Sequence, residues 1–141
     1  RDPLERLTAE LGLGHQIQIL GLCRNVPELL LTHRIAVLST HYEGMPLALI
    51  EGMAAGCAVV GSAVPGVREV IDHEVNGLLV PESDAVALAD ALERLLRDPA
   101  LAERLGASAQ EVVAREYTRE RMGARYEQLF QTLASEPPRT P

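Results

Sequence analysis

The chain has 141 residues, enough for one domain with its own hydrophobic core. Its apolar content of 47% and charged content of 23% are typical of a globular protein in water. The formal net charge of −7 argues against nucleic-acid binding, which requires a basic surface, and no apolar run is long enough to span a membrane. Small phosphorylated ligands are not excluded, because backbone N–H groups can hold phosphate without basic side chains.

The two cysteines and the first residue bear on location. Cys23 and Cys57 lack the C-x-x-C spacing of redox and metal sites, so we interpret them as reduced thiols of a cytoplasmic protein. No signal peptide pattern is visible. The chain begins with Arg1 rather than Met, which we interpret as a cut or processed end.

Short apolar runs alternate with helical patterns along the chain. The runs predict four strands, at residues 16–21, 35–39, 58–61 and 77–80. The segments around them predict helices or turns at residues 3–11, 26–32, 46–55 and 67–71. Beyond Pro81 the composition predicts three helices, from Ser83 or Asp84 to 97, from 99 to 116, and from 118 to 133. Residues 135–141 contain three prolines and predict a disordered tail.

This alternation predicts an α/β fold, a Rossmann-like doubly wound parallel sheet followed by C-terminal helices. In such sheets ligands bind outside the carboxyl ends of the strands, at helix N-termini. The rule selects the loop between the strand at 35–39 and the helix that begins near Pro46. We therefore expect the chemistry of the protein in that loop.

The loop and the start of its helix predict an anion site. Gly44 allows backbone to approach a ligand closely, and Pro46 fixes φ in the first helical turn. The N–H groups of Met45, Leu47 and Ala48 are predicted to be unpaired at the positive end of the helix dipole.

Two glutamates accompany this predicted anion site. Glu51 lies about 40° round the helix from Leu47, beside small residues that leave space for a vicinal diol such as ribose. Glu43 precedes the helix, so we expect it to lie near the group that is attached to the bound phosphate. From the residues alone a second interpretation stays open, in which Glu43 is only a favourable charge at a helix N-terminus and Glu51 is a surface residue.

Several motifs in the same order resemble one enzyme family. Glu43 and Glu51 form the E-x7-E pattern of retaining GT-B glycosyltransferases, and the surroundings resemble family 4. The other matching segments are residues 21–30, 43–46, 49–56, 64–70, 76–81, the helix with Leu88, Leu92, Leu95 and Pro99, and the ending with Arg115, Tyr117 and Tyr126. The resemblance covers nearly the whole chain and identifies residues 1–134 as an N-terminally truncated donor-binding domain of such an enzyme.

The resemblance implies a nucleotide-diphosphate sugar, linked to UDP, GDP or ADP, as the ligand. It implies that Glu51 binds the ribose hydroxyls and that Glu43 contacts the donor sugar as the catalytic residue. The diphosphate would bind at Gly44, Met45, Pro46 and Leu47, with a hydroxyl from Thr40. The base would contact the turn that contains Leu22, Cys23, Arg24 and Val26.

The resemblance also implies the reaction. It predicts transfer of a hexose-type sugar to an acceptor with retention of configuration, with no metal and no further cofactor. The acceptor-binding N-terminal domain of the family and two segments with cationic diphosphate ligands are not present in the sequence. Transfer is therefore expected from a longer protein, not from this chain alone. The location implied is cytoplasmic, with peripheral membrane contact through the other domain.

The sequence also departs from the family pattern and leaves rival functions. Arg34 stands where an Asp is common, and the strands implied as central to the sheet are not present, so the remaining four could leave a gap. The main alternative is a non-catalytic nucleotide-sugar-binding or structural α/β module. A sugar-nucleotide epimerase would need a further carboxylate and His set, and a receiver-like domain would need an acidic Mg²⁺ cluster.

Overall fold

Three parallel strands form the sheet of the computed structural model, which describes residues 2–135. They are β1 (Ile35–Leu38), β2 (Ala58–Ser62) and β3 (Leu78–Val80), paired in that order. Both pairs are parallel, so each connection crosses over the sheet and carries a helix. The predicted strands at residues 35–39, 58–61 and 77–80 are confirmed.

Helices occupy all the segments in which the sequence predicts them. They are α1 (Asp2–Glu10), α2 (Val26–Thr32), α3 (Leu47–Ala54), α4 (Pro65–Arg68), α5 (Ala85–Arg97), α6 (Pro99–Glu116) and α7 (Arg119–Ser135). Of the two predicted caps for α5, Asp84 is the one that accepts a hydrogen bond, from the Ala87 N–H at 2.9 Å. Thr118 accepts from the Arg121 N–H at 3.1 Å and so marks the break between α6 and α7.

The core lies on both faces of β2, whose five residues are all buried. Val59 packs in a cluster with apolar residues of α3 and α4 on one face. Ala58 and Val60 pack on the other face with apolar residues of α5 and α6. The successive side chains of a strand point to opposite faces, so one continuous apolar run serves two helical layers. This confirms the doubly wound α/β arrangement.

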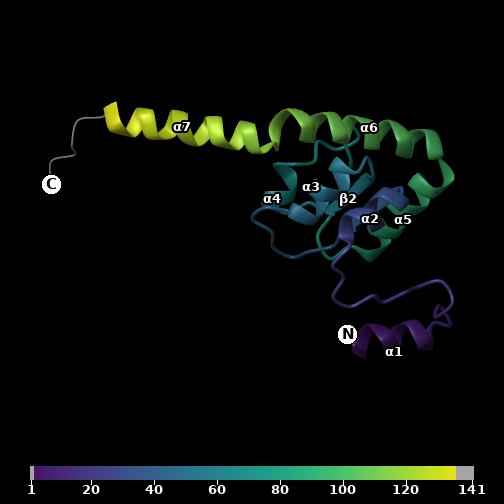
Figure 1. The fold of residues 1–141 in the computed structure, drawn as a ribbon. Helices are drawn as coiled ribbons and strands as arrows, with labels where there is room; N and C mark the ends of the chain where they lie inside the picture. The colour runs from purple at the N-terminus through teal and green to yellow at the C-terminus, as the bar shows by residue number, and fades with distance from the viewer. Residues whose placement is uncertain (1, 136–141) are drawn as a thin grey trace.

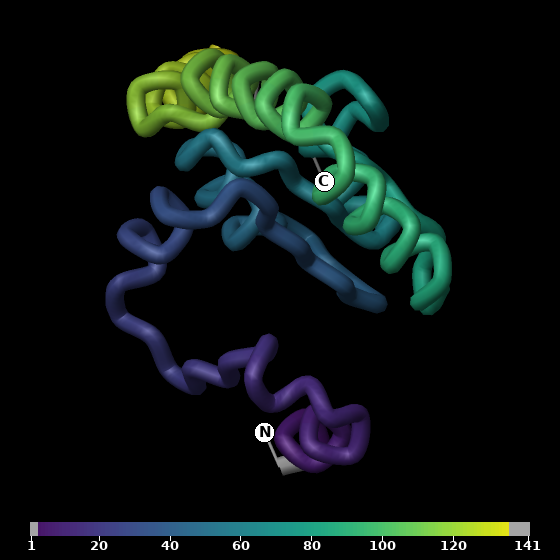
Figure 2. Tube along the Cα trace, turned by 90° about the vertical axis from the view of Figure 1, so that its right-hand side faces the viewer, coloured from purple at the N-terminus to yellow at the C-terminus, as the bar shows by residue number. Residues whose placement is uncertain are grey.

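The predicted strand at residues 16–21 is wrong. Gln16 and Ile17 donate their N–H groups to the Leu13 carbonyl in a turn, and the following residues join no ladder. A strand requires a hydrogen-bonded neighbour, and β1, β2 and β3 pair only among themselves in the part of the chain that the structure describes. Ile17 and Leu20 remain about half exposed. Figures 1 and 2 show the segment and α1 standing apart from the sheet.

The C-terminal helices form the longest straight feature of the chain. Helix α6 crosses the layer that contains α3, and α7 continues beyond the sheet (Figure 1). None of the residues of α7 is buried, and its exposed apolar side chains are Met122, Tyr126, Leu129, Phe130 and Leu133. No helix within residues 2–135 combines the length and apolar character needed to cross a bilayer. Ser135 closes α7, and the rest of the predicted disordered tail lies outside the described residues.

Candidate functional site

The loop selected by the sequence follows β1 and leads directly into α3. Its first turn is closed by Thr40, whose hydroxyl donates to the Tyr42 carbonyl at 2.8 Å. The Thr40 N–H donates to the Ser62 hydroxyl at 3.1 Å, which ties the loop to the carboxyl end of β2. Pro46 is buried and precedes the first residue of α3. The loop therefore has a defined shape at the edge of the sheet where ligands bind in such folds.

Close contact with α4 fixes the middle of the loop. The Glu43 carbonyl accepts the Gly66 N–H at 3.2 Å. A Cβ at Gly66 would lie 2.3 Å from the Glu43 carbonyl oxygen and 2.6 Å from that of Gly44. These are backbone atoms that cannot move aside, so only glycine permits this approach. The position of Glu43 in the loop thus depends on the glycine of a neighbouring helix.

The predicted set of free amides is partly wrong. The Met45 N–H donates to Glu43 Oε1 at 3.2 Å, because the half-buried carboxylate folds back to the start of the helix. The Leu47 N–H donates to the Met45 carbonyl at 2.8 Å in a tight turn that Pro46 promotes. Ala48, the third predicted amide, has no acceptor for its N–H among residues 2–135, and neither has Gly44. Of the three predicted amides only that of Ala48 is therefore free, and the Gly44 amide adds a second free donor next to the helix start.

Glu51 lies in α3 and is exposed, above a groove that α2 closes on its other side. This Glu51 groove has a volume of about 310 Å³ and is mostly apolar. Its lining residues are Pro27, Leu30, Leu31, Glu51, Ala54 and Ala55. The small residues beside Glu51 leave the carboxylate reachable from solvent, as the sequence predicts.

The predicted base-contacting turn leads into α2. Leu22 is 92% exposed and Arg24 is exposed as well, so both are available to a ligand. The Cys23 thiol donates to Asn25 Oδ1 at 2.8 Å, which holds the turn together. Val26 then begins α2, and the later residues of the same helix line the Glu51 groove. A single short helix thus connects the turn at 22–26 to the carboxylate of Glu51.

The structure does not bring all the predicted residues into one cavity. Glu51 lines its groove with α2, whereas Met45 and Leu47 line a separate apolar groove of about 470 Å³ against α7. Thr40 lines a third hollow, at the ends of the strands. Glu43 lines none of these three hollows. The common placement of the two glutamates around one ligand stays a prediction.

The groove of Met45 and Leu47 has a charged rim at the junction of α6 and α7. Glu116 accepts hydrogen bonds from Arg115 at 3.1 Å and from Arg125 at 2.7 Å. The Arg115 hydrogen bond, with the charges of Arg121 and Arg125, lowers the pKa of Glu116 below its ordinary value. The carboxylate therefore stays charged and holds α7 against the end of α6.

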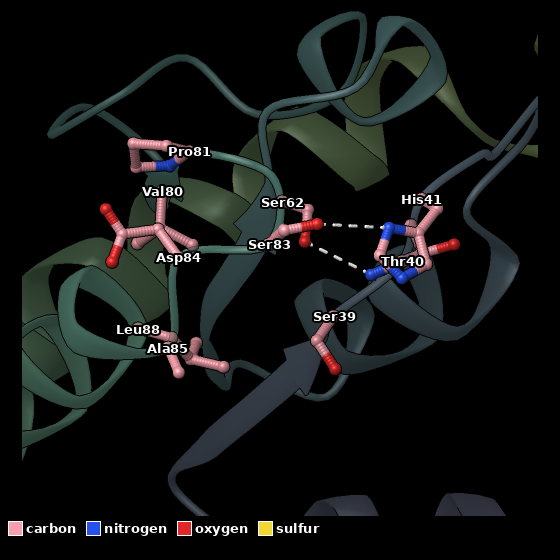
Figure 3. Close-up of a pocket in the computed structure, with 10 residues that line it drawn as sticks. All are labelled: Ser39, Thr40, His41, Ser62, Val80, Pro81, Ser83, Asp84, Ala85 and Leu88. Atoms are coloured by element: carbon pink, nitrogen blue, oxygen red, sulfur yellow. Dashed lines mark hydrogen bonds between the residues drawn. The ribbon is translucent and has the colours of Figure 1, made fainter.

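The third hollow contains residues that the sequence analysis did not assign to a site. We call it the strand-end recess; its lining residues are Ser39, Thr40, His41, Ser62, Val80, Pro81, Ser83, Asp84, Ala85 and Leu88 (Figure 3). Ser39, Ser62 and Pro81 each stand at the carboxyl end of a different strand. The strand-end rule that selected the loop applies equally to the ends of β2 and β3 and could have found them. Across residues 2–135, no group of three or more His, Cys, Asp and Glu side chains is placed to hold a metal ion.

Comparisons with known proteins agree on one family. The family model for glycosyl transferases group 1 matches residues 1–112. The lipopolysaccharide core biosynthesis glycosyltransferase LpsD of Rhizobium meliloti is 34% identical over 130 residues, which are 92% of this chain and 38% of that protein. Curated relatives like it are thus about three times as long as the matched segment.

Solved structures of the same kind share the fold. A sucrose-phosphate synthase from Thermosynechococcus elongatus superposes with a TM-score of 0.86 and 34% identity, over 94% of this chain and 34% of that one. Anabaena HepE, solved in complex with UDP and glucose, superposes with a TM-score of 0.85 and 22% identity, over 96% of this chain and 36% of that one. These superpositions support the expected fold, part of a GT-B glycosyltransferase. The chain belongs to the glycosyl transferases group 1 family.

Proposed function

We propose that the chain is the donor-binding domain of a family 4 glycosyltransferase and binds a nucleotide-diphosphate sugar. The observation that carries the proposal is the placement of Glu51: an accessible carboxylate on α3, above a groove that α2 closes. A carboxylate in such a place can accept hydrogen bonds from both hydroxyls of a ribose. The relatives support this choice, since Anabaena HepE and the structurally similar TarM of S. aureus were solved with UDP.

The remaining site residues receive their roles from their position relative to Glu51. The turn with Leu22, Cys23 and Arg24, together with Val26 at the start of α2, holds the base. The free N–H groups of Gly44 and Ala48, at the positive end of α3, hold the diphosphate. Thr40 contributes its hydroxyl beside them, which requires that the O–H leave the Tyr42 carbonyl to which it donates in this structure.

Glu43 acts as a link between the sugar and the diphosphate. Without ligand its carboxylate holds the Met45 N–H at 3.2 Å. A donor sugar that bonds the same carboxylate takes the place of Met45, and the Met45 amide is then free for a phosphate oxygen. Pro46 and Leu47 fix the direction of these amides. Binding of the sugar and binding of the diphosphate therefore support each other.

The reaction follows from this arrangement. The bond between the sugar and the diphosphate breaks as charge develops on the leaving phosphate, and oriented N–H groups stabilise that charge without a metal or a further cofactor. We propose transfer to an acceptor with retention of configuration. The acceptor is held by an N-terminal domain across the site, so the 141-residue chain alone binds donor but transfers no sugar. We place the enzyme in the cytoplasm, where its free thiols Cys23 and Cys57 stay reduced.

Isothermal titration of the chain with UDP, GDP and ADP tests the proposal. We expect one of the three to bind with one-to-one stoichiometry, and the matching monophosphate to bind more weakly because it lacks one phosphate for the amides of α3. Inorganic phosphate serves as the control for simple anion binding. Equal affinity for all three diphosphates and phosphate would mean that the chain has only a general anion site.

A further inference from the structure

The strand-end recess lies beside the proposed donor loop, and apart from Thr40 its lining residues have no part in the proposed donor binding. It has a volume of about 280 Å³, at the lower end of the range for small-molecule sites. The carboxyl ends of β1, β2 and β3 form its floor, and the start of α5 forms one wall (Figure 3). Thr40 belongs to both the recess and the donor loop, so a ligand in the recess would lie next to the donor.

Ser62 provides a buried hydrogen-bond donor at the floor of the recess. Its residue is only 5% exposed, and its hydroxyl oxygen accepts the Thr40 N–H at 3.1 Å. In the part of the chain that the structure describes, that hydroxyl donates to no acceptor. A buried O–H group is costly to leave without an acceptor. The Ser62 oxygen thus already has one partner in the chain, and its own proton is available to an oxygen atom from a ligand.

At the mouth of the recess, hydrogen bonds hold the side chain of His41. His41 Nδ1 lies 2.9 Å from Glu82 Oε1 and 3.3 Å from the Ser83 hydroxyl. Ser83 has a φ of 60°, a left-handed conformation that is uncommon for residues other than glycine. Because Nδ1 is used, Nε2 is the imidazole atom that remains for a ligand. Ser39 adds a hydroxyl from the end of β1.

The composition of the lining selects the chemistry of the ligand. The lining holds serine, threonine, imidazole and carboxylate groups but no Lys or Arg, and Glu82 adds a negative charge at the mouth. Phosphate is therefore disfavoured. Val80, Pro81 and Leu88 provide an apolar wall against which the C–H face of a ring can pack. Hydroxyl-rich groups beside an apolar wall match a neutral sugar ring.

We propose that the strand-end recess binds a neutral saccharide ring, with Ser62 and Ser39 bonding its hydroxyls and His41 closing the mouth. The assignment of that ring to the acceptor rests on the proposed function: the N-terminal domain holds the rest of the acceptor, and one ring reaches the recess, which adjoins the donor loop at Thr40. The site is thus a second sugar subsite, separate from the groove of Glu51.

Titration of the ¹⁵N-labelled chain with the methyl glycosides of glucose, galactose and mannose tests this proposal by NMR. We expect at least one of them to cause saturable shifts of the amides of Thr40, Ser83 and Ala85. The variants Ser62→Ala and Ser39→Ala should each weaken that binding about fivefold to tenfold, as expected for one lost hydrogen bond. Ser108→Ala in α6 is the matched control and should bind as the original chain does. Unchanged amide shifts in α6 show that each variant is folded.

The outcomes separate this proposal from the donor proposal. No saturable shift with any of the three glycosides, or undiminished binding in both serine variants, overturns the saccharide subsite even if nucleotide binds. Phosphate that shifts the same amides overturns it too. Saccharide binding without nucleotide binding supports the recess as a sugar site and overturns its assignment to the acceptor of this reaction.

Discussion

The variant Glu51→Ala is expected to bind its nucleoside diphosphate at least about a hundredfold more weakly than the original chain. The physical reason is the loss of two hydrogen bonds from ribose hydroxyls to a charged group, each of which contributes about 1.5–3 kcal/mol. Glu51 is exposed at the edge of α3 and is not part of the core, so its replacement should leave the fold intact. Calorimetric titration measures the change in affinity.

Two further variants isolate the carboxylate in that experiment. Glu51→Gln keeps the shape of the side chain but removes its charge, and we expect an intermediate loss of affinity. Glu111→Gln removes an exposed carboxylate from α6, so it makes the same change in net charge far along the chain from the groove. If Glu51→Ala and Glu111→Gln bind nucleotide equally well, Glu51 does not bind the ribose.

Gly106→Ala is expected to lower the free energy of unfolding by about 3 kcal/mol, the size typical of forced overpacking in a core. Gly106 lies where α6 crosses the turn after α3. A Cβ there would lie 2.1 Å from the Gly56 carbonyl oxygen and 3.3 Å from the Ala58 N atom. Both are backbone atoms next to the central strand, so neither can rotate away. The helix must shift, and with it the buried side chains of Leu105 and Ala109.

The same substitution in α7 serves as the matched control for chemical denaturation. Gly123 also lies inside a helix, but a Cβ there would meet no atom within 4 Å. Alanine favours a helix over glycine by about 0.5–1 kcal/mol, so Gly123→Ala should stabilise α7 slightly or leave the midpoint unchanged. If both variants unfold at the same denaturant concentration, a Cβ at Gly106 does not clash with the backbone of Gly56, and the predicted loss of stability is wrong.

Local sequence signals were sufficient for most of the fold. The runs at β2 and β3 are largely buried, whereas the run at β1 is apolar although its residues are half-buried or exposed, and Pro, Gly and Asp residues mark the helix ends. The run at residues 16–21 instead alternates polar and apolar residues, with Ile17 and Ile19 on one face, and it forms no strand. A strand depends on a neighbour elsewhere in the chain, and no local pattern reports whether that neighbour is present.

The sequence predicted those properties of the candidate site that depend on neighbours within the same helix or loop. Glu51 is accessible because its helical neighbours are small, which the sequence shows directly. The engagement of the Met45 amide depends on the Glu43 side chain folding back, and a rotamer of this kind is not encoded in spacing. The closeness of Gly66 to the loop depends on packing between segments. The residues of the strand-end recess lie within reach of the strand-end rule, but the shape of the recess depends on how three strand ends pack together.

The central claim is that Glu51 and the start of α3 hold the two ends of a nucleoside diphosphate. A crystal structure of the chain with its preferred nucleoside diphosphate tests this most directly. We predict ribose hydroxyls within hydrogen-bond distance of the Glu51 carboxylate and phosphate oxygens on the amides of Gly44 and Ala48. A nucleotide bound elsewhere, with Glu51 facing only solvent, would contradict the account.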